Sequence, residues 1–219
     1  MSRKAFMSFP IISKNYPLIL ASASPRRKRL LRQIGLPFRS LPSNLEETQV
    51  MGNPPVRARL LAEKKALSVH SRSNKSWVLG ADTMVVLGKT ILSKPKDHDE
   101  AQSRLFLLSG KGHNVVTGFC VLDPSGDIAH AEAISTLVKV KSLREEEIMA
   151  YVATGEPFGK AGGYAIQGIG SFMVESISGS YSNVVGLPLY ALIRSLLATG
   201  ALKNFPSLPG NAWSNPRPH

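Results

Sequence analysis

Apolar and polar residues along the first part of the chain follow the periods of a strand and then of a helix. Residues 18–21 form a short continuous apolar run, which is typical of a buried strand. Ser24 and Pro25 follow, and Ser at the N-cap with Pro at the first helical position is a common helix start. The sequence therefore predicts a strand and then a helix over residues 25–33, which Gly35 ends.

The same alternation of strands and helices continues to about residue 198. Further strands are predicted over residues 77–87, 114–122, 128–141 and 171–177, with a hairpin turn at 88–90. Further helices are predicted over residues 54–70, 97–109, 142–153 and 187–198. Two of these helices carry a capping box, formed by Asp97 with Glu100 and by Ser142 with Glu145. A chain that alternates in this way is expected to form an α/β fold.

One folded domain is expected over residues 16–203. Residues 1–15 are interpreted as a loose tail, because Pro10 interrupts the apolar stretch that a signal peptide would need. Residues 204–219 contain four prolines and are expected to be disordered. No apolar run approaches the ~20 residues of a membrane span, so no membrane association is expected.

The formal net charge of +12 is confined to the first third of the chain. Residues 1–75 hold 15 Lys and Arg residues against 3 Asp and Glu residues, whereas residues 76–219 hold 12 of each. Such an excess favours a polyanionic ligand: a nucleotide, a nucleic acid or an acidic membrane. Cys120 is the single cysteine, so no intrachain disulfide can form, and a reducing compartment such as the cytoplasm is expected.

Two arginines occupy the first turn of the predicted helix 25–33. A helix N-terminus carries partial positive charge, so Arg26 and Arg27 are mildly repelled there unless an anion binds. Free backbone N–H groups and two serines, Ser22 and Ser24, lie beside them. Phosphate is the natural candidate for the anion, and an ordinary basic surface helix is the alternative.

A carboxylate stands in the middle of the predicted strand 77–87. Burying an unpaired carboxylate is costly, so Asp82 needs a metal, a cation or several hydrogen bonds. Gly80 would let another backbone or a ligand approach the strand closely. Further on, residues 159–168 form a glycine-dense loop that contains Lys160 and Gln167 and could wrap a ligand, although on its own this segment is better explained as a structural turn.

These segments together resemble the Maf family of nucleotide pyrophosphatases. The resemblance rests on eight blocks that occur in order: LILASASPRR (18–27), LEE (45–47), the helix with Lys64-Lys65, GADT (80–83), LSKPKD (92–97), LSG with His113, KAGGYAIQG (160–168) and NVVGLPL (183–189). It implies an inosine-triphosphatase-like fold, with a central mixed sheet and two lobes enclosing a cleft. It also implies a hydrolase acting on phosphoric anhydride bonds, which converts a nucleoside triphosphate to a monophosphate and pyrophosphate with a divalent metal.

The block AGGYAIQG is similar to the branch of the family that acts on dTTP and UTP. Carried over by position, the resemblance implies that Asp82 is the proton acceptor and that Arg26, Thr83 and Gln167 govern substrate choice. Substrate and phosphate contacts are expected from Ser22, Arg27, Lys65, Lys94 and Lys160, and Mg²⁺ or Mn²⁺ is expected on Glu47 and Asp82. The expected ligand is a pyrimidine nucleoside triphosphate, common or modified, and a homodimer is possible.

The chain departs from the family pattern at Gly159, where relatives usually have Asp before the lysine. If that carboxylate helps to hold the metal or to orient Lys160, activity is reduced here. The departure leaves open a non-catalytic nucleotide-binding regulator of cell division, since the family is named for an effect on septum formation. A nucleic-acid-binding protein is the other alternative, but aromatic residues are sparse in the basic third and no binding motif occurs, so stable nucleic-acid binding is not expected.

Overall fold

A mixed seven-stranded sheet forms the centre of the protein. The computed structural model describes residues 9–43, 45, 50–73 and 75–206. The strands are β1 (Leu18–Leu20), β2 (Phe38–Ser40), β3 (Val78–Leu87), β4 (Thr90–Leu92), β5 (Gly112–Leu122), β6 (Ile128–Val140) and β7 (Val174–Ser178). Their order is β2-β1-β3-β5-β6-β7, and β4 pairs with β3 as a hairpin. β1 runs parallel to β2 and β3, and the other pairs are antiparallel.

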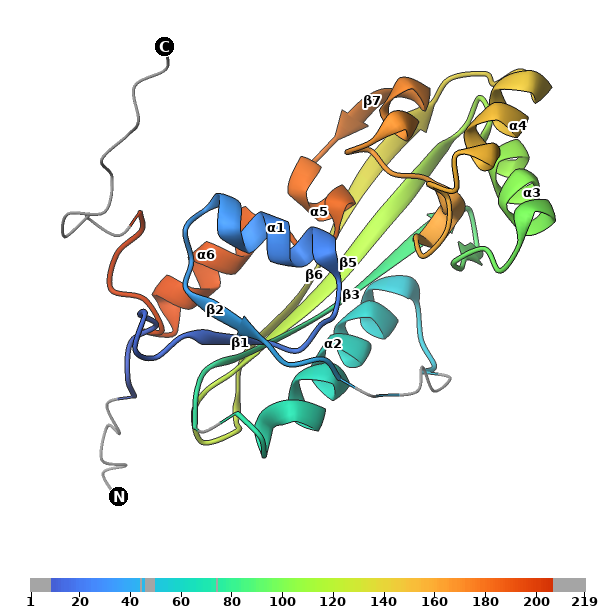
Figure 1. The fold of residues 1–219 in the computed structure, drawn as a ribbon. Coiled ribbons are helices and arrows are strands. Elements are labelled where there is room, and N and C mark those ends of the chain that lie inside the picture. The colour runs from blue at the N-terminus through green and yellow to red at the C-terminus, as the bar shows by residue number, and fades with distance from the viewer. Residues whose placement is uncertain (1–8, 44, 46–49, 74, 207–219) are drawn as a thin grey trace, which may run out of the picture.

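Helices cover both faces of this sheet (Figure 1). They are α1 (Pro25–Gln33), α2 (Pro54–His70), α3 (His98–Leu108), α4 (Glu145–Ala153), α5 (Tyr181–Val185) and α6 (Leu189–Ala198). Leu18 and Leu20 of β1 pack in one core with α1 and α6, whereas Ile19 and Ala21 pack in another with α2. Successive strand residues point to opposite faces, so the apolar run of β1 is explained by burial on both sides.

Two glycines let α2 lie directly on the sheet. A Cβ atom at Gly80 would come 2.0 Å from the main-chain oxygen of Ala62, and one at Gly118 would come 2.2 Å from the carbonyl carbon of Ala58. Only glycine fits at such distances, because the helix backbone occupies the space of a side chain. The expectation that Gly80 permits a close backbone approach is therefore confirmed, and the backbone is that of α2.

The long strands β3, β5 and β6 extend from the half that contains α1 and α6 to a half that contains α3 and α4 (Figure 1). The second half has its own core, which includes Leu105 of α3, Ile148 of α4 and Tyr164 of the glycine-dense loop. The predicted α/β fold with a mixed sheet and two lobes is confirmed. In the described part of the chain, no helix has both the length and the apolar character that a bilayer crossing requires.

Several predicted boundaries are wrong, for local reasons. Helix α4 begins at Glu145, and its N-cap is Arg144 rather than Ser142. The carboxylate that accepts the N-cap N–H is that of Glu147, at 2.9 Å from the nitrogen of Arg144, and an ion pair with Lys141 holds it there. The predicted capping box was therefore placed two residues too early.

The elements around the glycine-dense loop also differ from the prediction. Residues 171–173 belong to a 3₁₀ turn, Ile169–Met173, and the strand begins only at Val174. The predicted last helix corresponds to α6 and begins two residues later than expected, at Leu189, while the short helix α5 ahead of it was not predicted. The three-residue strand β2 was not predicted, because it is too short to show a period.

The segment ahead of β1 is attached to the domain. Trp77 donates from its indole nitrogen to the main-chain oxygen of Pro10 at 2.8 Å, and the Ile12 amide donates to the oxygen of Ala201 at 2.9 Å. The folded unit thus begins before residue 16, and the loose tail expected over residues 1–15 is wrong for this part. Residues 1–8 and 207–219 lie outside the described residues.

Candidate active site

Strand β3 has a stretch of edge that no described strand covers. On that side β1 pairs with β3 only at Val78 and Leu79, and β4 pairs only from Val85 onward. We call the stretch between them, Gly80–Met84, the open edge. The main-chain oxygen of Leu79 accepts a hydrogen bond from the amide of Ala21, the residue after β1, at 2.8 Å. Backbone groups alternate between the two edges of a strand, so the N–H and C=O groups of Ala81 and Thr83 point to the open edge.

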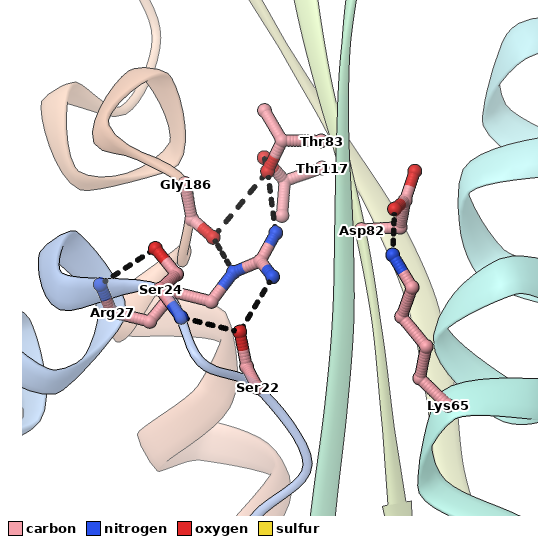
Figure 2. A network of polar contacts seen from close by, with 8 residues as sticks. All are labelled: Ser22, Ser24, Arg27, Lys65, Asp82, Thr83, Thr117 and Gly186. Carbon is pink, nitrogen blue, oxygen red and sulfur yellow. Dashed lines mark hydrogen bonds and ion pairs between the residues drawn. The ribbon is translucent and has the colours of Figure 1, made fainter. Parts of the chain in front are cut away.

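On one face of the open edge, Asp82 forms an ion pair with α2. The Nζ of Lys65 lies 2.5 Å from Oδ1 of Asp82, and their side chains are 13% and 10% exposed (Figure 2). The expectation that buried Asp82 needs a partner is confirmed, and a lysine seventeen residues earlier supplies the cation. That Asp82 accepts a proton stays a prediction.

On the opposite face, Arg27 of α1 is buried in a polar network (Figure 2). Its Nε donates to the main-chain oxygen of Gly186 at 2.8 Å, and its two terminal nitrogens donate to Ser22 Oγ at 3.2 Å and to Thr83 Oγ1 at 3.0 Å. Thr83 also lies 3.0 Å from the hydroxyl of Thr117. Arg27 thereby joins α1 to β3 and to the turn between α5 and α6, while phosphate contact by Arg27 and Ser22 stays a prediction.

The predicted residues thus fall into two groups on opposite faces of the sheet. Asp82 and Thr83 are neighbours in β3, so their side chains point to opposite sides. Asp82 faces Lys65 of α2, whereas Thr83 faces Arg27 of α1, as Figure 2 shows. The two groups come next to each other at the open edge, where Asp82 and Thr83 are adjacent in β3.

Two further cations, Arg26 and Lys160, interact across space. Arg26 is half-buried in the first turn of α1, and burial lowers the pKa of its guanidinium. Burial also lowers the pKa of the Lys160 ammonium, and the charge of Arg26 lowers it further. Lys160 donates to the main-chain oxygen of Glu156 and, at 3.4 Å, to that of Phe158. Two partly buried like charges near each other favour the binding of an anion.

Gly159, next to Lys160, has a positive φ of 73°, a backbone conformation that favours glycine. A Cβ atom there would meet no atom within 4 Å in the structure. A side chain at this position would thus find space but would strain the backbone.

The remaining predicted residues lie elsewhere or outside the description. Lys94 is exposed in the segment between β4 and α3. Glu47, the second predicted metal ligand, lies outside the described residues, so its placement is untested. In the described part of the chain, no three His, Cys, Asp or Glu side chains gather as a ready metal cage.

Gln167 lies at a surface hollow of about 570 Å³ beside α1. The other residues that line it are Arg29, Arg32, Gln33 and Tyr181. None of these four was predicted as a site residue. The helical period could have indicated two of them, because Arg29 and Gln33 follow Arg26 at intervals of three and seven residues and so lie on the same side of α1. Tyr181 comes from a distant segment, and its place beside Gln167 could not be read from spacing.

Comparison with known proteins places the chain among nucleotide pyrophosphatases by sequence similarity. Residues 17–199 match the sequence model of a family described as "Maf-like protein". The chain is 49% identical, over 80% of its length and 92% of the relative's, to a dTTP/UTP pyrophosphatase of Ruminiclostridium cellulolyticum. It is 48% identical to one of Citrifermentans bemidjiense, over 87% and 100% of the two chains, and 45% identical to one of Aquifex aeolicus, over 82% and 95%.

Proposed function

The chain belongs to the Maf family, and we propose that it hydrolyses dTTP and UTP, each to the nucleoside monophosphate and pyrophosphate. Relatives named dTTP/UTP pyrophosphatase share nearly half of its residues over most of both chains. The structural observation that carries the proposal is the placement of Asp82, paired with Lys65, at the open edge of β3.

The phosphate chain of the substrate would lie against the cationic side chains near the open edge. Arg26 and Lys160 already repel each other, so a triphosphate between them would relieve that repulsion. Lys65 and Lys94 are the further cations that we assign to the phosphates. The main-chain N–H groups of Ala81 and Thr83, which point to the open edge, offer two more donors to phosphate oxygens.

Hydrolysis to a monophosphate requires water to attack the α-phosphorus while pyrophosphate leaves. We assign Asp82 as the group that accepts the proton of that water. Its carboxylate is almost buried, so few other solvent molecules compete with the attacking water for it. The ion pair with Lys65 fixes the carboxylate on one face of β3 and brings a cation close to the developing charge.

A divalent cation fits the residues that are present. Mg²⁺ and Mn²⁺ are commonly held by one or two carboxylates together with phosphate oxygens of the substrate, and Asp82 supplies such a carboxylate. Glu47 is the proposed second ligand. When bound, the metal would bridge phosphate oxygens and neutralise charge that develops on them.

We assign the choice of base to Gln167. The N3–H group of uracil and thymine is a donor and O4 is an acceptor, so a side-chain amide can accept from the first and donate to the second. The hollow at Gln167 also contains Tyr181, whose ring offers a flat apolar surface to the base. Cytosine presents the reverse pattern at N3 and C4, so it would leave polar groups mispaired with the same amide orientation.

Pyrophosphate release from a panel of triphosphates tests this function. We expect the highest kcat/KM for dTTP and UTP, with Mg²⁺ or with Mn²⁺, and a lower value for CTP. Gln167→Ala should reduce the preference over CTP, while Gln33→Ala, the other glutamine that lines the hollow, serves as the matched control. Faster turnover of ATP, ITP or 7-methyl-GTP would contradict the proposed substrates.

This panel and a nucleic-acid-binding assay separate the enzyme from the two alternatives. Nucleotide binding without any pyrophosphate release would favour a non-catalytic regulator of septum formation. Tight RNA or DNA binding that weakens steeply with salt would favour a nucleic-acid-binding protein. A cytoplasmic location and a homodimer are parts of the proposal that these assays do not address, and cell fractionation and analytical ultracentrifugation test them.

A further inference from the structure

We propose that Glu156 and Tyr151 are positioning residues for substrate selection, because they hold the loop that carries Gln167 in one conformation. This inference rests on the proposed function, in which Gln167 reads the base. It concerns residues that do not themselves contact the hollow at Gln167. Their role follows from a set of hydrogen bonds on both sides of Gln167 in the chain.

The carboxylate of Glu156 binds the loop after Gln167. Its Oε1 accepts from the amide of Ile169 at 3.0 Å, and its Oε2 accepts from the amide of Gly170 at 2.8 Å. Burial raises the pKa of this carboxyl, but these backbone hydrogen bonds and that of Tyr151 outweigh burial and leave the pKa below its usual value. Glu156 is therefore an anion matched to the main chain of the loop.

The hydroxyl of Tyr151 binds the loop before Gln167. It donates to Oε2 of Glu156 at 2.8 Å and accepts from the amide of Ala165 at 3.2 Å. The tyrosine ring is almost completely buried at the end of α4, so it provides a rigid support. Gln167 is thus bracketed by a bonded amide two residues before it and by bonded amides two and three residues after it.

The loop also packs directly on these two side chains. A Cβ atom at Gly168 would come 1.7 Å from Oε1 of Glu156, and one at Gly170 would come 2.7 Å from the hydroxyl oxygen of Tyr151. No side chain fits between the loop and its support. Any shift of Glu156 or Tyr151 would therefore move the backbone that carries Gln167, because no intervening side chain can absorb it.

Glu156 also contacts the phosphate end of the proposed site. Lys160 donates from Nζ to its main-chain oxygen, not to its carboxylate. Substitution of the Glu156 side chain should therefore disturb the base end of the site and leave the Lys160 hydrogen bond in place. The charge of the Glu156 carboxylate also acts on Lys160, and Tyr151→Phe is the variant that keeps this charge. This separation gives the proposal a signature that a general loss of stability does not have.

The test compares Glu156→Gln and Tyr151→Phe with the wild type. The amide of glutamine cannot accept from both loop amides and the hydroxyl at once, and phenylalanine removes the hydroxyl but keeps the ring. Glu175→Gln is the matched control, because Glu175 is half-exposed on β7 and is paired only on the surface, with Lys139. We measure kcat and KM for UTP and CTP, and the inhibition constant of inorganic tripolyphosphate, which has no base.

For both variants we expect kcat/KM for UTP to fall about 10-fold, mainly through KM, and the preference for UTP over CTP to fall with it. For Tyr151→Phe the inhibition constant of tripolyphosphate should change less than about twofold, because the phosphate contacts are not disturbed. Glu156→Gln should bind tripolyphosphate no more weakly than the wild type, because it removes a negative charge that acts on Lys160. Adding Gln167→Ala to Glu156→Gln should cause little further loss of preference, since one residue acts through the other.

Two outcomes overturn different claims. If UTP, CTP and tripolyphosphate are all affected equally, or if the wild-type preference persists in the folded Tyr151→Phe variant, Glu156 and Tyr151 are structural supports without a selective role. If the wild type itself hydrolyses neither UTP nor dTTP, the proposed function fails. The wild-type measurement therefore decides between the two failures.

Discussion

The two faces of the open edge use positive charge in different ways. On the α1 face, the buried guanidinium of Arg27 is held by neutral oxygens from Gly186, Ser22 and Thr83. On the α2 face, Lys65 meets a carboxylate, Asp82, in an ion pair. The first arrangement connects four segments of the chain, while the second joins one helix to one strand.

We interpret the α1 face as a structural framework and the α2 face as the reaction centre. A planar guanidinium with several directed donors ties segments together, and loss of it leaves several buried acceptors without partners. A lysine paired with an aspartate can also bind the substrate, because its ammonium has further N–H donors for a phosphate oxygen. We therefore expect variants on the α1 face to change stability and variants on the α2 face to change turnover.

The largest effect is expected from Asp82→Asn. The amide keeps the shape but loses the negative charge and the basicity, so turnover of UTP should fall about 100-fold or more. The melting temperature should stay close to the wild-type value, because the amide oxygen can still accept from Lys65. Steady-state kinetics with a thermal melt check both statements, and Asp99→Asn in the exposed first turn of α3 is the control. Near-normal turnover by a folded variant would remove Asp82 from the mechanism.

On the other face, Arg27→Met should mainly cost stability. The substitution keeps the apolar stem of the side chain but removes its hydrogen bonds to Gly186, Ser22 and Thr83. We expect the free energy of unfolding to fall by about 2–3 kcal/mol, since buried acceptors lose charged donors. Urea denaturation measures the change, with Arg29→Met on the exposed side of the same helix as the control. An unchanged free energy of unfolding would break the contrast between the two faces.

Arg26→Ala tests the neighbouring cation, which differs from Arg27 in its surroundings. Loss of a charge-assisted contact should weaken triphosphate binding by roughly 1.5–3 kcal/mol. Stability without nucleotide should be unchanged or slightly higher, because the variant removes a cation from a helix N-terminus and relieves its repulsion with Lys160. Calorimetric titration with a non-hydrolysable UTP analogue and a melt of the free protein measure the two effects. A clear loss of stability would show that Arg26 is part of the framework.

The sequence predicted the elements better than their partners. Burial of Asp82 in an apolar run required a compensating group, and the structure supplies Lys65, but nothing in the spacing singled out that lysine from the other cations of the basic third. Gly80 predicted a close approach without saying that α2 makes it. Local propensity predicts the secondary structure of a segment, whereas contacts between side chains of distant segments depend on how the helices pack on the sheet.

The same limit explains why Glu156 and Tyr151 were missed. Their partners are backbone amides of Ala165, Ile169 and Gly170, and an amide leaves no signature in the sequence. The split of Asp82 and Thr83 between two faces was, by contrast, available from strand alternation alone. A resemblance by position assigns roles to Asp82 and Thr83 without assigning the directions of their side chains.

The smallest effect is expected from Thr83→Val, which probes the meeting point of the two faces. The hydroxyl accepts from Arg27 at 3.0 Å and lies 3.0 Å from that of Thr117, so its loss should cost about 1 kcal/mol of stability. If Thr83 also takes part in substrate choice, the preference for UTP over CTP should change while kcat for UTP stays within about threefold, because Asp82 on the other face is untouched. The ratio of kcat/KM values and a urea titration measure the two effects separately. A loss of stability with an unchanged preference would confine Thr83 to the framework of the α1 face and leave Gln167 to select the base.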